Sequence, residues 1–92
     1  MRLPVELFGL ARRLGGEKEV IVEVSDEATL CDVVVALTRR FPAFLGPLVV
    51  PDTYELEEPY FFNYDGRRVA KSLKERPQEG DRLLLFLVDA GG

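Results

Sequence analysis

The 92-residue sequence contains no histidine and no tryptophan, and it has one cysteine and one methionine. Without histidine, the commonest general base and the commonest metal ligand are both absent. No GxxxxGK[ST] or GxGxxG pattern occurs, so no phosphate-binding loop is visible. These absences disfavour an enzyme, a metal site and a stably bound cofactor. They are compatible with a protein that is the substrate of an enzyme.

Long apolar runs and excess positive charge are also lacking. No apolar run approaches about 18 residues, which predicts no membrane span, and residues 1–20 lack the pattern of a signal peptide. The formal net charge of −4 disfavours nucleic acid as a partner. Cys31, being alone, can form no intrachain disulfide, which fits a cytoplasmic protein. We interpret it as a structural residue, with a persulfide or a mixed disulfide at Cys31 as the alternative.

What the sequence does have is a substantial apolar content. Hydrophobic residues make up 47% of the chain, which predicts a single small domain over residues 1–92 with one core. Apolar and polar residues alternate from Arg2 to Phe8 and from Glu19 to Val24, which predicts two strands that pair as an antiparallel hairpin. Between them, Leu10–Leu14 is a turn or short helix that Gly15-Gly16 ends.

One helix is clearly indicated after these strands. Thr29 and Asp32 resemble a capping box, and Pro42 ends the segment. Arg39 and Arg40 lie in the predicted last turn, where positive charge is favourable. We interpret them as a solvated helix end, with contact to an acidic partner as the alternative. The apolar stripe of this helix consists of Leu30, Val33, Val34, Leu37 and Phe41.

Residues 43–59 contain three prolines and several acidic residues, and they predict an irregular connection. Its apolar start predicts that Phe44, Leu45 and Leu48 contact the core. The acidic group Glu55, Glu57 and Glu58 is interpreted as a solvated loop, with a bound cation or a basic enzyme surface as alternatives.

The last third of the sequence predicts three more strands. Aromatic content indicates a strand at Tyr60–Tyr64, and a turn at Asp65-Gly66 leads to a short return strand at Arg67–Ala70. Ser72–Arg76 is predicted to form one helical turn. The apolar run in Arg82–Val88 predicts a last strand that is central and buried on both faces. This order predicts an α+β protein of the β-grasp (ubiquitin-like) class, with a mixed sheet of four to five strands on one main helix.

The sequence ends in Ala90-Gly91-Gly92, directly after that apolar run. Glycine has no Cβ, so a Gly-Gly tail can lie extended and let its carboxylate enter a narrow cleft. One interpretation is a carboxyl terminus that another protein uses as a reactive group. The alternative is a frayed end that happens to be glycine.

Four segments, in order and spacing, resemble the MoaD/ThiS family of ubiquitin-like sulfur-carrier proteins. Residues 8–12 resemble the family's aromatic-small-x-x-Arg segment, residues 29–42 its helix signature, and residues 79–82 its Gly-Asp turn. Residues 90–92 match its functional tail. The chain is most similar to the small subunit of molybdopterin synthase, although residues 87–89 are Leu-Val-Asp where that subunit usually has two prolines.

The resemblance implies a carrier that is modified by enzymes and is not itself one. An E1-like adenylating enzyme of the MoeB/ThiF type would use ATP to join the Gly92 carboxylate to AMP, and a sulfurtransferase would supply the sulfur of a thiocarboxylate. The large catalytic subunit of molybdopterin synthase, or another sulfur acceptor enzyme, would receive the tail formed by Ala90, Gly91 and Gly92. Phe8 and Phe86 would contact these partners, with ordinary sheet packing as the alternative.

Three other functions stay open on the sequence. The chain could donate sulfur for cysteine, thiamine or tRNA thiolation. It could be a ubiquitin-like modifier that is conjugated to lysines. It could also be a β-grasp binding module whose tail is not conjugated.

Overall fold

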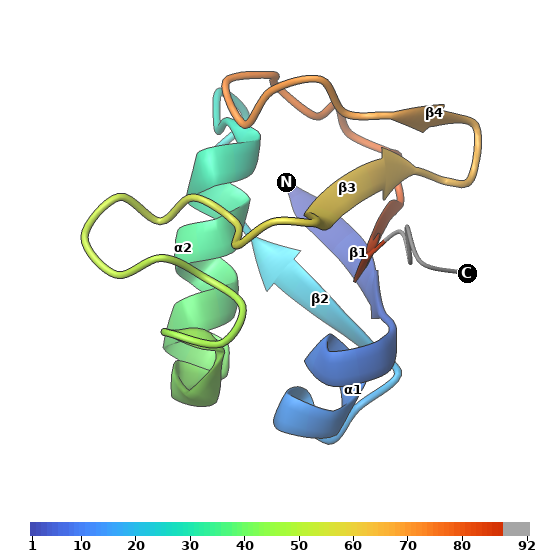
Figure 1. Ribbon diagram of the computed structural model, residues 1–92. Helices are drawn as coiled ribbons and strands as arrows, with labels where there is room; N and C mark the ends of the chain where they lie inside the picture. Colours follow the sequence, from blue (N-terminus) through green and yellow to red (C-terminus); the bar gives the residue numbers. More distant parts are fainter. Residues whose placement is uncertain (88–92) are drawn as a thin grey trace.

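The computed structural model describes residues 1–87 and shows a five-stranded mixed sheet with two helices (Figure 1). The strand order is β2-β1-β5-β3-β4. This arrangement confirms the predicted α+β β-grasp architecture. The elements are β1 (Arg2–Leu7), α1 (Gly9–Gly15), β2 (Glu19–Glu23), α2 (Leu30–Arg40), a 3-10 turn (Pro42–Phe44), β3 (Tyr60–Tyr64), β4 (Arg68–Val69) and β5 (Leu83–Leu87).

The first half of the chain forms as predicted. β1 and β2 pair antiparallel, and the short helix α1 connects them. α1 ends at Gly16, whose φ of 74° is the left-handed conformation that glycine adopts most easily. In α2 the Thr29 hydroxyl accepts from the backbone N–H of Asp32, while the Asp32 carboxylate accepts from the N–H of Thr29. The predicted capping box is therefore present.

β5 occupies the centre of the sheet, as predicted. It pairs parallel with β1 and antiparallel with β3. α2 lies along one side of this sheet, and Figure 1 shows it to the left of β1 and β2. The core between helix and sheet includes the fully buried Leu3, Val5, Leu7, Leu30, Val33, Val34, Leu37, Leu83 and Leu85.

The burial of β5 differs from the prediction that both of its faces are covered. Leu83 and Leu85 are fully buried, but Leu84 and Phe86 are only half-buried. The reason is that α2 covers one face of the sheet, and successive side chains of a strand point to opposite faces. The open face therefore carries large apolar side chains that α2 does not cover.

The 42–59 connection packs more tightly than an irregular loop. Phe44 and Leu48 are buried as predicted, but Leu45 is 37% exposed and Val49 is buried in its place. The backbone N–H groups of Leu48 and Val49 both donate to the carbonyl of Phe44, at 3.0 and 2.9 Å. This tight turn moves Leu45 outward, so the prediction for Leu45 is wrong.

Residues 72–76 form a single hydrogen-bonded turn, in which the N–H of Glu75 donates to the carbonyl of Ser72 at 3.3 Å, and they do not form a helix. The Glu75 carboxylate accepts from the backbone N–H groups of Lys71 and Ser72, at 2.6 and 3.3 Å. The same carboxylate binds the Tyr64 hydroxyl at 3.2 Å and the Arg68 guanidinium at 3.1 Å. Glu75 thus ties the β3–β4 hairpin to the segment that follows it.

This segment also supports the start of α2. The N–H groups of Leu30 and Cys31 donate to the carbonyls of Glu75 and Leu73, at 2.9 and 3.0 Å. These bonds satisfy N–H groups that a helix start leaves without an intrahelical partner. Burial and the neighbouring Glu75 raise the pKa of the Tyr64 hydroxyl to about 12.

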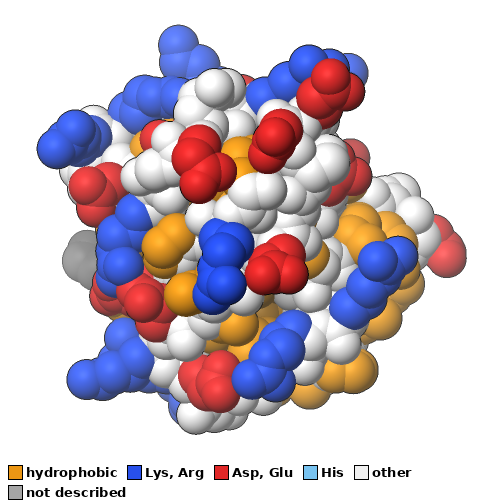
Figure 2. All heavy atoms as spheres, turned by 180° about the vertical axis from the view of Figure 1, so that it is seen from behind, with side chains coloured by type: hydrophobic (Ala, Val, Ile, Leu, Met, Phe, Trp, Pro, Cys, Tyr) orange, Lys and Arg blue, Asp and Glu red, His pale blue; other side chains and the backbone are white. Residues whose placement is uncertain are grey.

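On the surface, charges of both signs are mixed. Figure 2 shows Lys and Arg side chains interspersed with Asp and Glu, with hydrophobic side chains visible between them. Within the described part of the chain, no helix has the length and apolarity needed to cross a bilayer.

Candidate functional site

The reactive group predicted from the sequence, the Gly92 carboxylate, lies outside the described residues, as do Ala90 and Gly91. The described structure reaches Leu87, at the end of β5. The site is therefore built from the surface beside the end of this central strand, which precedes the tail in the sequence.

Three phenylalanine rings meet there on the open face of the sheet. Phe86 of β5 lies directly opposite Phe61 of β3, and their ring centroids are 4.6 Å apart. Phe8 lies edge-on to Phe86, with centroids 5.5 Å apart and an interplanar angle of 71°. All three side chains are half-buried. We refer to Phe8, Phe61 and Phe86 as the aromatic cluster.

The backbone holds Phe8 in this position. Phe8 is the residue before α1, and its extended backbone (φ −126°, ψ 155°) continues the direction of β1. Its N–H donates to the carbonyl of Leu85 at 3.2 Å, which prolongs the parallel pairing of β1 with β5. The side chain of Phe8 follows the buried Leu7, so alternation directs it to the open face.

Arg12 covers the outer side of the cluster. Its guanidinium lies 5.4 Å from the centroid of the Phe8 ring, within the range of a cation–π contact. Its Nε donates to the carbonyl of Leu7 at 2.9 Å, which fixes the side chain at the start of α1. The cluster therefore presents apolar rings with a positive charge at one side.

A second group of charges lies along the same face. Arg82 forms ion pairs with Glu6 of β1 and Glu19 of β2. The hydrogen bonds that Arg82 donates to the carboxylates of Glu6 and Glu19 raise the pKa of its guanidinium above the ordinary value. The open face thus changes from charged at the β2 side to aromatic around the end of β5.

The structure brings the two predicted contact residues, Phe8 and Phe86, into one cluster. Sequence reasoning missed Phe61 as its third member. Only the antiparallel register of β3 against β5 identifies it, because this register sets Phe61 directly opposite Phe86.

The cluster can bind apolar protein surface but offers no catalytic group. Aromatic side chains on an open face are typical of protein contact sites. Within residues 1–87, no group of three or more Cys, Asp or Glu residues is arranged to hold a metal ion. Cys31 is half-buried at the start of α2.

Solved structures resemble this chain over its whole length. SAMP1 from Haloferax volcanii is 29% identical with a TM-score of 0.84, and the match covers 100% of both chains. The chain shares the β-grasp, ubiquitin-like fold of the solved structures that it matches. A putative molybdopterin converting factor subunit 1 from Pyrococcus furiosus is 24% identical, with a TM-score of 0.73 over 94% of this chain and 95% of that chain.

A further match with this β-grasp fold is a chain of the BexX/CysO complex of Amycolatopsis orientalis. It is 21% identical, with a TM-score of 0.74 over 98% of this chain and 99% of that chain. Matches below 25% identity bear on the fold alone. No protein-family model and no curated protein matches the sequence.

Proposed function

We propose that this protein is a sulfur carrier whose Gly92 carboxylate is activated by an E1-like enzyme of the MoeB/ThiF type. The observation that carries the proposal is the aromatic cluster beside the end of β5, because the Ala90-Gly91-Gly92 tail follows that strand in the sequence. A partner bound to the cluster would have the tail within reach, since only Val88 and Asp89 separate it from β5.

The partner enzymes carry out the chemical steps. A free carboxylate is a poor electrophile, so the activating enzyme first joins Gly92 to AMP at the expense of ATP, with release of pyrophosphate. A sulfide equivalent from a sulfurtransferase then displaces AMP and leaves a thiocarboxylate. The role of this chain is to be recognised and to present a slender tail that lets the carboxylate enter a narrow active site. It is a substrate and a carrier subunit.

For the acceptor, we propose the large catalytic subunit of molybdopterin synthase, which makes this chain the small subunit. The sequence resemblance supports this assignment. The putative molybdopterin converting factor subunit from Pyrococcus furiosus has the same fold. Sulfur acceptors in cysteine, thiamine or tRNA thiolation pathways are the alternatives within the same chemistry.

Intact mass spectrometry of the chain purified from its native host under non-reducing conditions tests the carrier role. The expected result is a mass gain equal to the exchange of one oxygen for one sulfur, mapped to Gly92. A chain without Gly92 should show no such gain. If wild-type chain stays unmodified even with the activating enzyme, ATP and a sulfide source, the carrier proposal is wrong.

A second candidate function is conjugation to lysines of other proteins. It is favoured by two structures of the Haloferax volcanii small archaeal modifier protein 1, both 29% identical to this chain, with TM-scores of 0.84 and 0.81. Peptides from a tryptic digest that carry the Gly92 carbonyl on a lysine amine would support it. Absence of both thiocarboxylate and lysine adducts would favour a non-conjugated binding module.

A further inference from the structure

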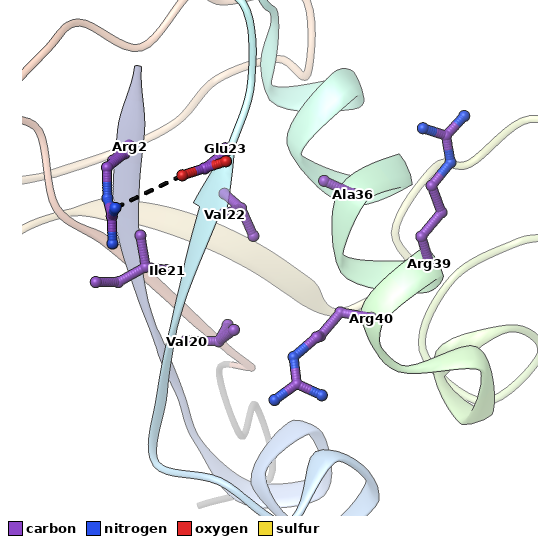
Figure 3. A pocket seen from close by; sticks show the side chains of 8 residues that line it. All are labelled: Arg2, Val20, Ile21, Val22, Glu23, Ala36, Arg39 and Arg40. Carbon is purple, nitrogen blue, oxygen red and sulfur yellow. Dashed lines mark ion pairs between the residues drawn. The ribbon is translucent and has the colours of Figure 1, made fainter.

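A second surface lies at the other side of the molecule from β3 and β4, between β2 and α2. Figure 3 shows this groove, which has a volume of about 460 Å³. Val20 and Val22 point from β2 toward α2, and Ala36 faces them from the helix. Arg40 reaches into the gap from the end of α2, and Arg39 lies on its rim. None of these residues belongs to the aromatic cluster.

β2 is an edge strand, and its outer side has free hydrogen-bonding groups. Met1 and Val24 exchange backbone hydrogen bonds in both directions, at 2.6 and 3.0 Å, and Lys18 accepts from Leu7 at 2.7 Å. Because bonded and non-bonded pairs alternate in an antiparallel ladder, Val20 and Val22 bond to β1.

The same alternation turns the N–H and C=O groups of Glu19, Ile21 and Glu23 away from β1. Within residues 1–87, the backbone N–H and C=O groups of these three residues form no hydrogen bond with the backbone of a turn, loop or helix cap. The position of Pro4 opposite Ile21 fits this pattern, because that pair exchanges no hydrogen bonds and proline has no N–H to donate. Such an edge is a template for an added strand.

The groove is positive although the chain as a whole has a net charge of −4. Arg2, Arg39 and Arg40 line it, against the single carboxylate of Glu23. Arg2 lies 3.6 Å from Glu23, and Arg40 lies 3.1 Å from Glu17 and is stacked 4.9 Å from the Phe41 ring. Within residues 1–87, Arg39 makes no ion pair. The uncompensated charge favours an acidic occupant.

A second copy of the chain is a poor occupant of this edge. Two β2 strands paired antiparallel about Ile21 would set Glu19 of each copy opposite Glu23 of the other. Like charges directly opposite each other destabilise a strand pair. Charged residues on an edge strand are one way in which proteins avoid self-association.

We propose that β2 binds an extended acidic segment of another protein, which adds to the sheet as a sixth strand beside β2. The backbone of the segment would bond to the free groups of Glu19, Ile21 and Glu23. Its apolar side chains would pack beside Ala36 and over the nearly buried Val20 and Val22. Its carboxylates would pair with Arg39, which has no ion pair in the described chain, and with Arg40, which also pairs with Glu17. Because this edge shares no residue with the aromatic cluster, a partner can hold β2 while the tail engages an enzyme.

A peptide titration of the isotope-labelled full chain, followed by NMR, tests this proposal. The probe is a short synthetic peptide that alternates valine and threonine and ends in three aspartates. The control peptide carries N-methyl groups at alternate positions, which removes the donors needed for strand pairing. With the probe peptide we expect saturable changes in the NMR chemical shifts of Glu19, Ile21, Glu23 and the last turn of α2. With the control peptide we expect no such changes.

Two variants separate the backbone and charge contributions. Ile21→Pro removes an outward N–H together with the isoleucine side chain and is expected to weaken binding about tenfold. Ile21→Thr also loses the isoleucine side chain but keeps the N–H donor, and its binding should stay within about threefold of wild type. The double variant Arg39→Gln with Arg40→Gln should weaken binding about fivefold at low salt. Arg13→Gln with Arg67→Gln, which removes two exposed charges elsewhere, should leave binding unchanged.

Three results would overturn the proposal. The first is no shift along β2 at millimolar peptide. The second is a set of shifts confined to Phe8, Phe61 and Phe86, which would place the peptide on the aromatic cluster. The third is concentration-dependent dimerisation that Ile21→Pro abolishes, which would make a second copy the occupant. Peptide binding at β2 does not depend on whether Gly92 can be activated. The outcome of this test is therefore independent of the outcome for the proposed carrier role.

Discussion

Phe61 on β3 lies directly opposite Phe86 on β5, and their rings are 4.6 Å apart on the face of the sheet that α2 leaves uncovered. Cross-strand aromatic pairs stabilise a sheet by roughly 0.5–1.5 kcal/mol beyond the area they bury. These two rings, together with Phe8, nevertheless stay only partly buried. Their position beside the end of the last strand makes them the proposed docking surface for an enzyme that uses the tail.

Replacing Phe86 should impair activation while the chain stays folded. Phe86→Ala removes the ring that contacts both Phe8 and Phe61, and aromatic residues at the centre of an interface commonly contribute about 2 kcal/mol or more to binding. We therefore expect affinity for the activating enzyme to fall roughly thirtyfold. Isothermal titration calorimetry with the activating enzyme measures this loss.

The control for Phe86→Ala is Leu45→Ala. Leu45 is 37% exposed and lies in the 42–59 connection, outside the aromatic cluster. Its truncation should leave the affinity unchanged. Equal affinity of wild-type and Phe86→Ala chains, with both folded by circular dichroism, would exclude the cluster as the docking surface.

The tail should be sensitive to bulk at its penultimate position. Gly91→Val adds a branched side chain next to the carboxylate, which a narrow active-site cleft cannot admit. We expect adenylation of Gly92 to be lost and the melting temperature to be unchanged. Pyrophosphate release with the activating enzyme and ATP measures the first, and a thermal melt measures the second. Normal pyrophosphate release by Gly91→Val would contradict the proposed use of the tail.

Truncation to alanine at two adjacent residues of the 42–59 connection should change the free energy of unfolding by very different amounts. Phe44 is fully buried and stacks on Phe41, with ring centroids 5.1 Å apart. Phe44→Ala should lower the free energy of unfolding by about 3–5 kcal/mol. Leu45→Ala should change it by less than about 0.5 kcal/mol. Urea denaturation followed by circular dichroism measures both, and similar losses in the two variants would contradict the burial described above.

The sequence carries enough information to predict most of this fold. The period-2 alternation of Leu3, Val5 and Leu7 marks β1, and the Thr29 capping box with its apolar stripe marks α2 almost to the residue. These signals are local, since each depends on side chains within a few positions of one another. The predicted contact residues Phe8 and Phe86 also lie in one cluster.

The errors arise where distant contacts override local patterns. The run of six apolar residues from Leu83 to Val88 in the sequence indicates a strand buried on both faces, but whether a second layer covers a sheet depends on the rest of the chain. Residues 72–76 have helical propensity, yet the Glu75 carboxylate takes the backbone N–H groups of Lys71 and Ser72. Phe61 joins the cluster only through the register of β3 with β5. None of these contacts can be recognised from the few residues that surround each position in the sequence.

The stability contributed by Glu75 should depend on pH. Hydrogen bonds from the backbone N–H of Lys71, from Arg68 and from Tyr64 hold the pKa of Glu75 below its ordinary value. A carboxylate whose pKa is lower in the folded chain than in the unfolded chain stabilises the fold above its unfolded pKa, which is about 4.3. This contribution is lost as the pH falls through the folded pKa, because both states then bind the proton.

A comparison of Glu75→Gln with the wild-type chain isolates this contribution, because all other carboxylates are common to both. At pH 7 the variant should unfold at lower urea, with a loss of about 1–3 kcal/mol from hydrogen bonds to a charged acceptor. As the pH falls from about 5 toward 3, the wild-type chain should lose more stability than the variant and the two midpoints should converge. Glu79→Gln, at an exposed position outside this network, is the control and should follow the wild-type curve. Midpoints of the wild-type chain and Glu75→Gln that stay equally far apart at every pH would show that the charge of Glu75 does not stabilise the hairpin.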